Sequence, residues 1–120
     1  MTALTTAGTI AIDRARASST GYHAEHVIRS GPLQQTVIAL LEGTRLAEHE
    51  ADVPASIYVL TGALRVTADD PFDLTSGDVH ELPLRRRSVV ALADTVLLLT
   101  AVTGVSGDDL DEHVHELPRA

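Results

Sequence analysis

The stretch that decides the fold is residues 43–62, which read GTRLAEHEADVPASIYVLTG. Two short strand-like runs, residues 44–49 and the more apolar residues 56–60, stand on either side of a turn at residues 52–54. Gly43 and Gly62 mark the two ends, and glycine supplies the positive φ that tight turns need. Runs of this length and composition, bounded by turn residues, are typical of β-strands.

Short runs separated by turn residues recur along most of the chain. We expect strands at residues 36–41, 44–49, 56–60, 64–67, 79–82, 88–92 and 95–102, separated by Gly, Pro and Asp. Short strands at this spacing, without a long helical period, indicate an all-β antiparallel barrel or sandwich. We interpret residues 22–104 as the β-domain and residues 1–21 as a flexible arm with a candidate edge strand at 9–12. Residues 105–120 read as an acidic tail that contains histidines.

Composition excludes several classes of function. The chain has 120 residues, which suits one domain, and its net charge of -8 disfavours nucleic-acid and anionic-membrane surfaces. It contains no Cys, so disulfides and thiolate metal sites are excluded. No window reaches the roughly 18 consecutive apolar residues of a membrane span. We therefore expect a soluble, cytoplasmic protein.

Two of the expected strands are apolar at nearly every position. They are residues 37–41 and 96–99. A strand of this kind is covered on both faces, and in so short a chain the second cover is expected to be another subunit. The sequence therefore predicts a homodimer.

The order of these elements resembles the cupin (RmlC-like) family, whose two motifs are G-x5-H-x-H-x3-E-x6-G and G-x5-P-x-G-x2-H-x3-N. The first motif is matched by Gly43, His49 and Gly62, and the second by Gly77 and Pro83. The match extends over about residues 35–102. It implies a single-domain, jelly-roll-like antiparallel β-barrel with a pocket inside, and a hairpin turn at Gly62.

Most metal-binding positions of the family are not kept in this chain. His49 holds the first ligand position, but the next two hold Ala51 and Ala55, and the last holds Ser88. A divalent transition metal needs about three converging nitrogen or carboxylate donors. We therefore expect no cofactor, with a divalent metal as the alternative. His23 and His26 are the residues that an arm folding over the barrel could bring to His49.

Without most of its metal ligands, the resembled barrel would have a candidate ligand pocket lined by His49, Ser88, Ala51 and Ala55. Arg45 shares the alternation of His49 on an ideal strand and would favour an anionic ligand such as a carboxylate. The opposing interpretation places Arg45 at a strand end in solvent.

Three functions are consistent with this pattern. The first is a metal-free binding or regulatory module for a small organic or anionic molecule. The second is a metal-dependent enzyme of the dioxygenase or isomerase type that uses His49 with unusual ligands. The third is a filled barrel that serves only as an interaction partner. An epimerase-like pair of His49 and Tyr58 is disfavoured, because Tyr58 should face away from the position of Ala55.

Overall fold

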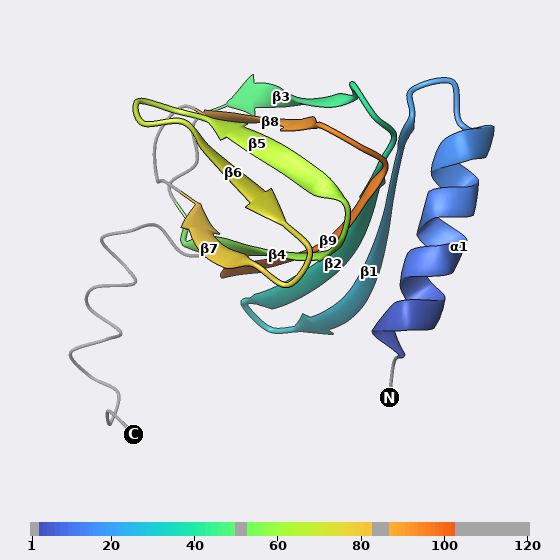
Figure 1. Ribbon diagram of the computed structural model, residues 1–120. Coiled ribbons are helices and arrows are strands. Elements are labelled where there is room, and N and C mark those ends of the chain that lie inside the picture. Colours follow the sequence, from blue (N-terminus) through green and yellow to red (C-terminus); the bar gives the residue numbers. More distant parts are fainter. Residues whose placement is uncertain (1–2, 50–52, 83–86, 103–120) are drawn as a thin grey trace.

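The computed structural model describes residues 3–49, 53–82 and 87–102, with the backbone alone at residues 47–49. Within this part of the chain, one helix precedes nine strands, and the strands form two antiparallel sheets that face each other (Figure 1). The predicted all-β antiparallel class is therefore confirmed. In the described residues no ladder joins the two sheets, so closure into a barrel stays a prediction. The predicted acidic tail at residues 105–120 lies outside the described residues.

The first sheet has five strands and the second has four. The five-stranded sheet has the order β1-β2-β9-β4-β7, and the four-stranded sheet has the order β3-β8-β5-β6. The elements are α1 (Leu4–Ala17), β1 (Tyr22–Ser30), β2 (Leu33–Leu40), β3 (Arg45–His49), β4 (Ala55–Thr61), β5 (Ala63–Thr67), β6 (Phe72–Thr75), β7 (Val79–Leu82), β8 (Arg87–Ala91) and β9 (Thr95–Val102).

The seven expected strands are confirmed to within a few residues, and two strands were missed. β1 is a largely exposed edge strand, so it lacks the apolar run that identified the others. β6 has only four residues, which is too short for a periodic signal.

The main core lies between the two sheets. Leu40, Ile57, Leu64 and Leu97 are its largest fully buried side chains. They alternate with outward-facing residues along β2, β4, β5 and β9, as the pleat of a strand requires. Burying a side chain of this size stabilises the folded state by about 1.5–3 kcal/mol.

Gly62 marks a corner at which the chain passes from one sheet to the other. β4 ends at Thr61 in the five-stranded sheet, and β5 begins at Ala63 in the four-stranded sheet. The predicted hairpin at Gly62 is therefore wrong, although its φ of 97° confirms the need for a glycine. A Cβ at this position would overlap the backbone oxygen of Asp94 and lie 2.8 Å from the Cα of Thr95.

The N-terminal segment is a helix, so the prediction of a flexible arm with an edge strand at residues 9–12 is wrong. α1 lies along the outer face of the five-stranded sheet (Figure 1). Its buried residues Gly8, Ala11 and Ala15 follow one helical face and let the backbone approach the sheet closely. Ala11 and Ala15 pack on Val37 and Ala39 of β2 in a second apolar cluster. The Thr and Ser content of this segment concealed that spacing.

The position of α1 also explains the two fully apolar strands. Val37, Ala39 and Val96 point away from the main core and are covered by the helix of the same chain. The apolar outer face of these strands indicated a contact with another subunit, but at these three residues the cover is α1 of the same chain. The homodimer stays a prediction.

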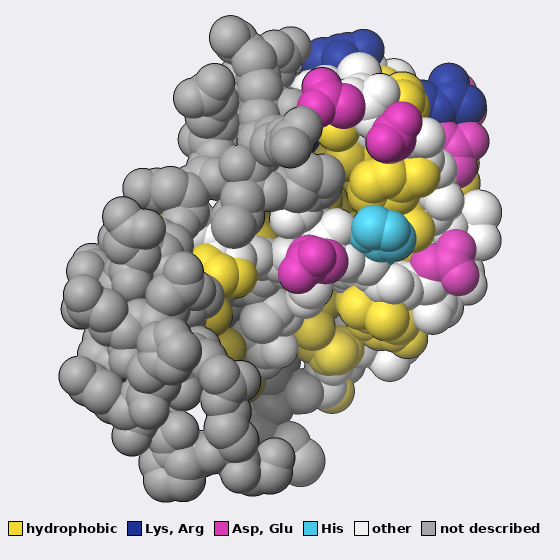
Figure 2. Space-filling view, turned by 90° about the vertical axis from the view of Figure 1, so that its left-hand side faces the viewer, with side chains coloured by type: hydrophobic (Ala, Val, Ile, Leu, Met, Phe, Trp, Pro, Cys, Tyr) yellow, Lys and Arg dark blue, Asp and Glu magenta, His cyan; other side chains and the backbone are white. Residues whose placement is uncertain are grey.

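One open side of the sandwich is bridged by two rings. The ring of Phe72 in β6 stacks on that of His80 in β7, with centroids 4.1 Å apart and an angle of 27° between planes. β6 and β7 are edge strands of different sheets, so this contact joins the sheets where backbone pairing stops. Figure 2 shows the side of the molecule that lies on the left in Figure 1, where hydrophobic and acidic side chains are mixed on the surface. Among the described residues, no helix is long and apolar enough to cross a membrane.

Candidate functional site

The candidate site is a small cavity between the two sheets. Its volume is about 80 Å³, and its walls come from strands of both sheets. Most of the lining is aliphatic, and one lining residue, Arg87, carries a charge. The lining residues are Ile38, Leu46, Ile57, Leu82, Arg87, Ser88, Val89, Leu97 and Leu99.

The register of β8 places Arg87 on the inner side of its sheet. Val89 and Ala91 pair with Val66 and Leu64 of β5, and all four belong to the core between the sheets. Because side chains alternate along a strand, Arg87 shares the face of Val89 and Ala91. Only 7% of Arg87 is exposed. Burial lowers the pKa of its guanidinium, although a guanidinium keeps its charge at neutral pH.

His49, the one retained ligand position, lies directly opposite Arg87 in the ladder between β3 and β8. The side chain of His49 and all of Ala51 lie outside the described residues. Ala55 is buried at the start of β4, where it pairs with Leu82 on one side and Ala101 on the other. The ladder thus brings the backbone of the first motif beside Arg87.

Arg45 and Ser88 contact each other on the outer face of the four-stranded sheet. Nη1 of Arg45 donates a hydrogen bond to Oγ of Ser88 at 2.9 Å. Arg45 pairs with Val90, and Ser88 pairs with Thr67, so both lie on the face opposite to Val89. Ser88 borders the cavity as well, but its hydroxyl is turned to Arg45.

The ladder between β3 and β8 contains an irregularity beyond Leu46. The register shifts between Leu46 and His49, so that Leu46 pairs with Val89 and His49 pairs with Arg87. Three residues of β3 thus advance against two of β8, as in a β-bulge. The strict alternation assumed from Arg45 to His49 is therefore interrupted in the backbone of this ladder, and the side chain of His49 lies outside the described residues.

His23 and His26 lie on opposite faces of β1. His23 pairs with Ala39 and its Nε2 lies 2.9 Å from Oε1 of Glu25. His26 pairs with Thr36, and its Nδ1 shares a hydrogen bond with the Thr36 hydroxyl at 3.0 Å. Neither histidine belongs to a group of three metal-binding side chains in the described part of the chain. Ala55 offers no donor, and the hydroxyl of Ser88 is turned to Arg45. The side chains in the described part of the chain therefore do not form a set of donors that fits a divalent metal.

Comparison with known proteins supports the architecture. No known protein-family model matches the sequence, and no curated protein matches it. Solved structures do match. A cupin superfamily protein from Desulfitobacterium hafniense has a TM-score of 0.63 at 18% identity, with 68% of this chain and 76% of that chain covered. This chain has the cupin fold.

Two further solved structures are similar to this cupin-fold chain to about the same degree. A conserved protein of unknown function from Streptococcus pyogenes has a TM-score of 0.65 at 19% identity, covering 74% of this chain and 80% of the other. A cupin 2 conserved barrel domain protein from Salinispora arenicola has a TM-score of 0.62 at 17% identity, covering 82% and 92%. The resemblance stated from the two motifs is therefore confirmed at the level of fold.

Proposed function

We propose that this chain is a metal-free cupin that binds a small carboxylate between its sheets. One observation carries the proposal: Arg87, a residue that is only 7% exposed, is the one charged residue that lines a largely aliphatic cavity among the described residues. A guanidinium pairs with a carboxylate through two parallel hydrogen bonds, and these are stronger at a buried site than in water. The proposal gives Arg87 the role that the sequence suggested for Arg45.

The size of the cavity limits the ligand. A volume of about 80 Å³ suits a carboxylate with one or two further carbon atoms and is too small for a sugar or a nucleotide. The aliphatic walls favour a ligand whose remaining atoms are apolar. We therefore expect acetate or propionate to serve as probes of the site.

The proposal is tested by thermal unfolding with added acetate at constant ionic strength, with neutral acetamide as the shape control. Acetate should raise the melting temperature of the wild type, and acetamide should not. Arg87→Gln should abolish the acetate effect, and Arg65→Gln, which changes an exposed arginine, should keep it. Arg87→Lys keeps the positive charge but lacks the two-pronged guanidinium, so it should show part of the acetate-induced rise in melting temperature. An acetate effect that survives in a folded Arg87→Gln variant would overturn the proposal.

The alternative, a metal-dependent enzyme that uses His49, is favoured by one observation. His49 lies opposite Arg87, which puts the retained ligand position at the level of the cavity. Further donors would then have to come from outside the described residues. Elemental analysis of untagged protein decides between the two: a stoichiometric metal that His49→Ala removes would support the enzyme and contradict the metal-free cupin.

A further inference from the structure

A second and larger hollow lies outside the sandwich, between α1 and the outer face of the five-stranded sheet. Its volume is about 510 Å³. α1 packs against β1, β2 and β9, so the outer face of β4 beside it stays open. We call this hollow the helix groove. Its apolar wall and floor are formed by Leu4, Gly8 and Ile12 of α1, Val96 of β9, and Tyr58 and Leu60 of β4.

We propose that the helix groove binds an uncharged, mainly hydrophobic organic molecule, at a site separate from the cavity between the sheets. Small-molecule sites typically have volumes of about 300–1,000 Å³ and mostly apolar walls with a few polar groups. The helix groove falls in this range with its 510 Å³, whereas the inner cavity has only 80 Å³. An organic molecule larger than a short acid therefore fits only the helix groove of these two.

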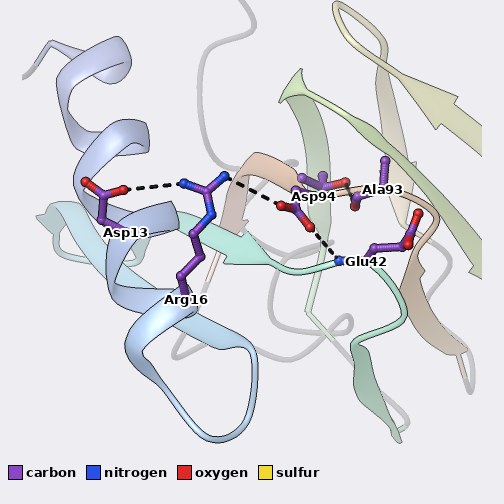
Figure 3. Close-up of polar contacts among 6 residues, drawn as sticks. Asp13, Arg16, Glu42, Ala93 and Asp94 are labelled. Atoms are coloured by element: carbon purple, nitrogen blue, oxygen red, sulfur yellow. Dashed lines mark hydrogen bonds and ion pairs between the residues drawn. The ribbon is translucent and has the colours of Figure 1, made fainter.

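The charges at the groove favour a neutral ligand. Two of its lining residues are charged, Arg16 and Asp94, and they form an ion pair at 3.6 Å. Arg16 also contacts Asp13 at 3.5 Å, and Oδ1 of Asp94 accepts a hydrogen bond from the backbone N–H of Glu42 at 2.9 Å (Figure 3). An anion near Arg16 would meet two carboxylates, and a cation would meet the guanidinium. Neither sign of charge gains a clear advantage.

Hydroxyl groups supply the polar part of the site. Tyr58 is 37% exposed on the outer face of β4, and Thr61 is exposed at the end of the same strand. Both line the groove, as does Thr9 of the helix. A hydroxyl can donate or accept, so these side chains suit a ligand with an alcohol, carbonyl or amide group. The aromatic ring of Tyr58 adds a flat apolar contact.

The experiment uses the full chain and the neutral fluorescent probe N-phenyl-1-naphthylamine. The probe should bind the wild type with one-to-one stoichiometry and a rise in fluorescence. Thr9→Phe places a ring in the groove from an exposed position and should weaken binding by about ten-fold or more. Thr6→Phe, an equal change on the same helix outside the groove, should leave binding unchanged. The anionic probe 1-anilinonaphthalene-8-sulfonate should bind more weakly than the neutral one.

Three results would overturn the proposal. They are equal probe affinity in Thr9→Phe and Thr6→Phe, tighter binding of the anionic probe, and no probe binding by the wild type. Sedimentation of the same variants tests another occupant: if Thr9→Phe turns a dimer into a monomer, a second copy of the chain fills the groove. Thermal unfolding verifies that each variant folds. Arg87→Gln should bind the neutral probe normally, so failure at the inner cavity and failure at the helix groove are distinguishable.

Discussion

Gly8 of α1 lies directly against Val96 of β9: a Cβ added to Gly8 would stand 3.0 Å from Cγ1 of Val96. That separation is shorter than ordinary carbon–carbon contact, which begins near 3.5 Å. A side chain at residue 8 would require Val96 or the helix to shift, so the glycine lets the helix lie this close to the sheet. Gly8 and Val96 both line the helix groove, so their contact helps to set the position of one of its walls.

A large side chain at residue 8 should push α1 away from the sheet. We expect Gly8→Leu to lower the free energy of unfolding by about 1–3 kcal/mol, which is typical of overpacking. The matched control is Thr6→Leu, an exposed change on the same helix that should have little effect. The measurement is the midpoint of urea unfolding. Equal midpoints for the two variants would show that α1 is not held through this contact.

Gly62→Ala should be more harmful than Gly43→Ala. Both glycines have positive φ, 97° and 83°, and this conformation costs a non-glycine residue about 1–3 kcal/mol. A Cβ at Gly62 would also overlap the Asp94 backbone oxygen, whereas a Cβ at Gly43 would meet nothing within 4 Å. The difference in unfolding free energy between the two variants therefore isolates the contact at the corner. The idea fails if Gly43→Ala is the less stable protein.

The pair of Arg65 and Asp73 should contribute to stability in a pH-dependent way. Nε and Nη2 of Arg65 donate hydrogen bonds to the two Asp73 oxygens at 2.7 and 3.0 Å. The hydrogen bonds, and then the charge of Arg65, hold the pKa of the Asp73 carboxyl below its usual value. A lowered folded-state pKa stabilises the protein above the unfolded pKa of about 3.9, and this contribution is lost as the pH falls through the folded value.

The test compares urea midpoints of the wild type and Asp73→Asn from pH 7 to pH 2. The wild type should be the more stable protein at neutral pH, and the difference should shrink as the pH falls below about 4. Both side chains are about half exposed, so the effect should be small and should weaken in salt. Asp70→Asn, on the neighbouring turn, is the control. A difference that stays constant down to pH 2 would contradict the electrostatic origin.

The predicted homodimer can be tested at edge strand β7. Val79 is 65% exposed, the largest exposed fraction among the large hydrophobic side chains that the structure describes. We expect the wild type to sediment at about twice the 12.7 kDa of one chain, and Val79→Lys to weaken the dimer, since a charge on an edge strand opposes pairing. Ile10→Lys, on the exposed side of α1, should have no such effect. A wild type that stays monomeric at all concentrations would refute the dimer.

Much of the fold was readable from the sequence because its signals are local. Residues 95–102 were predicted as a strand and form β9 with those bounds, since a long apolar run between turns has few alternatives. Tyr58 was expected to face away from the position of Ala55, and it does lie on the outer face of β4, because β4 alternates regularly from Ala55 to Val59. Gly77, which matches a glycine of the second motif, has a φ of 91°, a conformation that glycine adopts readily.

The candidate site was less readable because it depends on register. One irregularity in the backbone register of β3 lies between Leu46 and His49, and no residue type in the sequence marks it. Arg87 was not among the candidate site residues, although its alternation with Val89 and Ala91 was the available signal for an inward position. The helix was missed for a related reason: Gly8, Ala11 and Ala15 gain their meaning only when a sheet lies beneath them.

The sequence by itself determined most of the strands and the need for glycine at Gly62, because these follow from short-range periodicity and from the chemistry of single residues. Only the tertiary structure decided which side chains face inward, since a ladder with one extra residue exchanges the two faces of a strand. It also decided what covers the outer face of the five-stranded sheet. That face is apolar in the sequence, and the three-dimensional fold brings α1 over part of it and leaves the helix groove beside it.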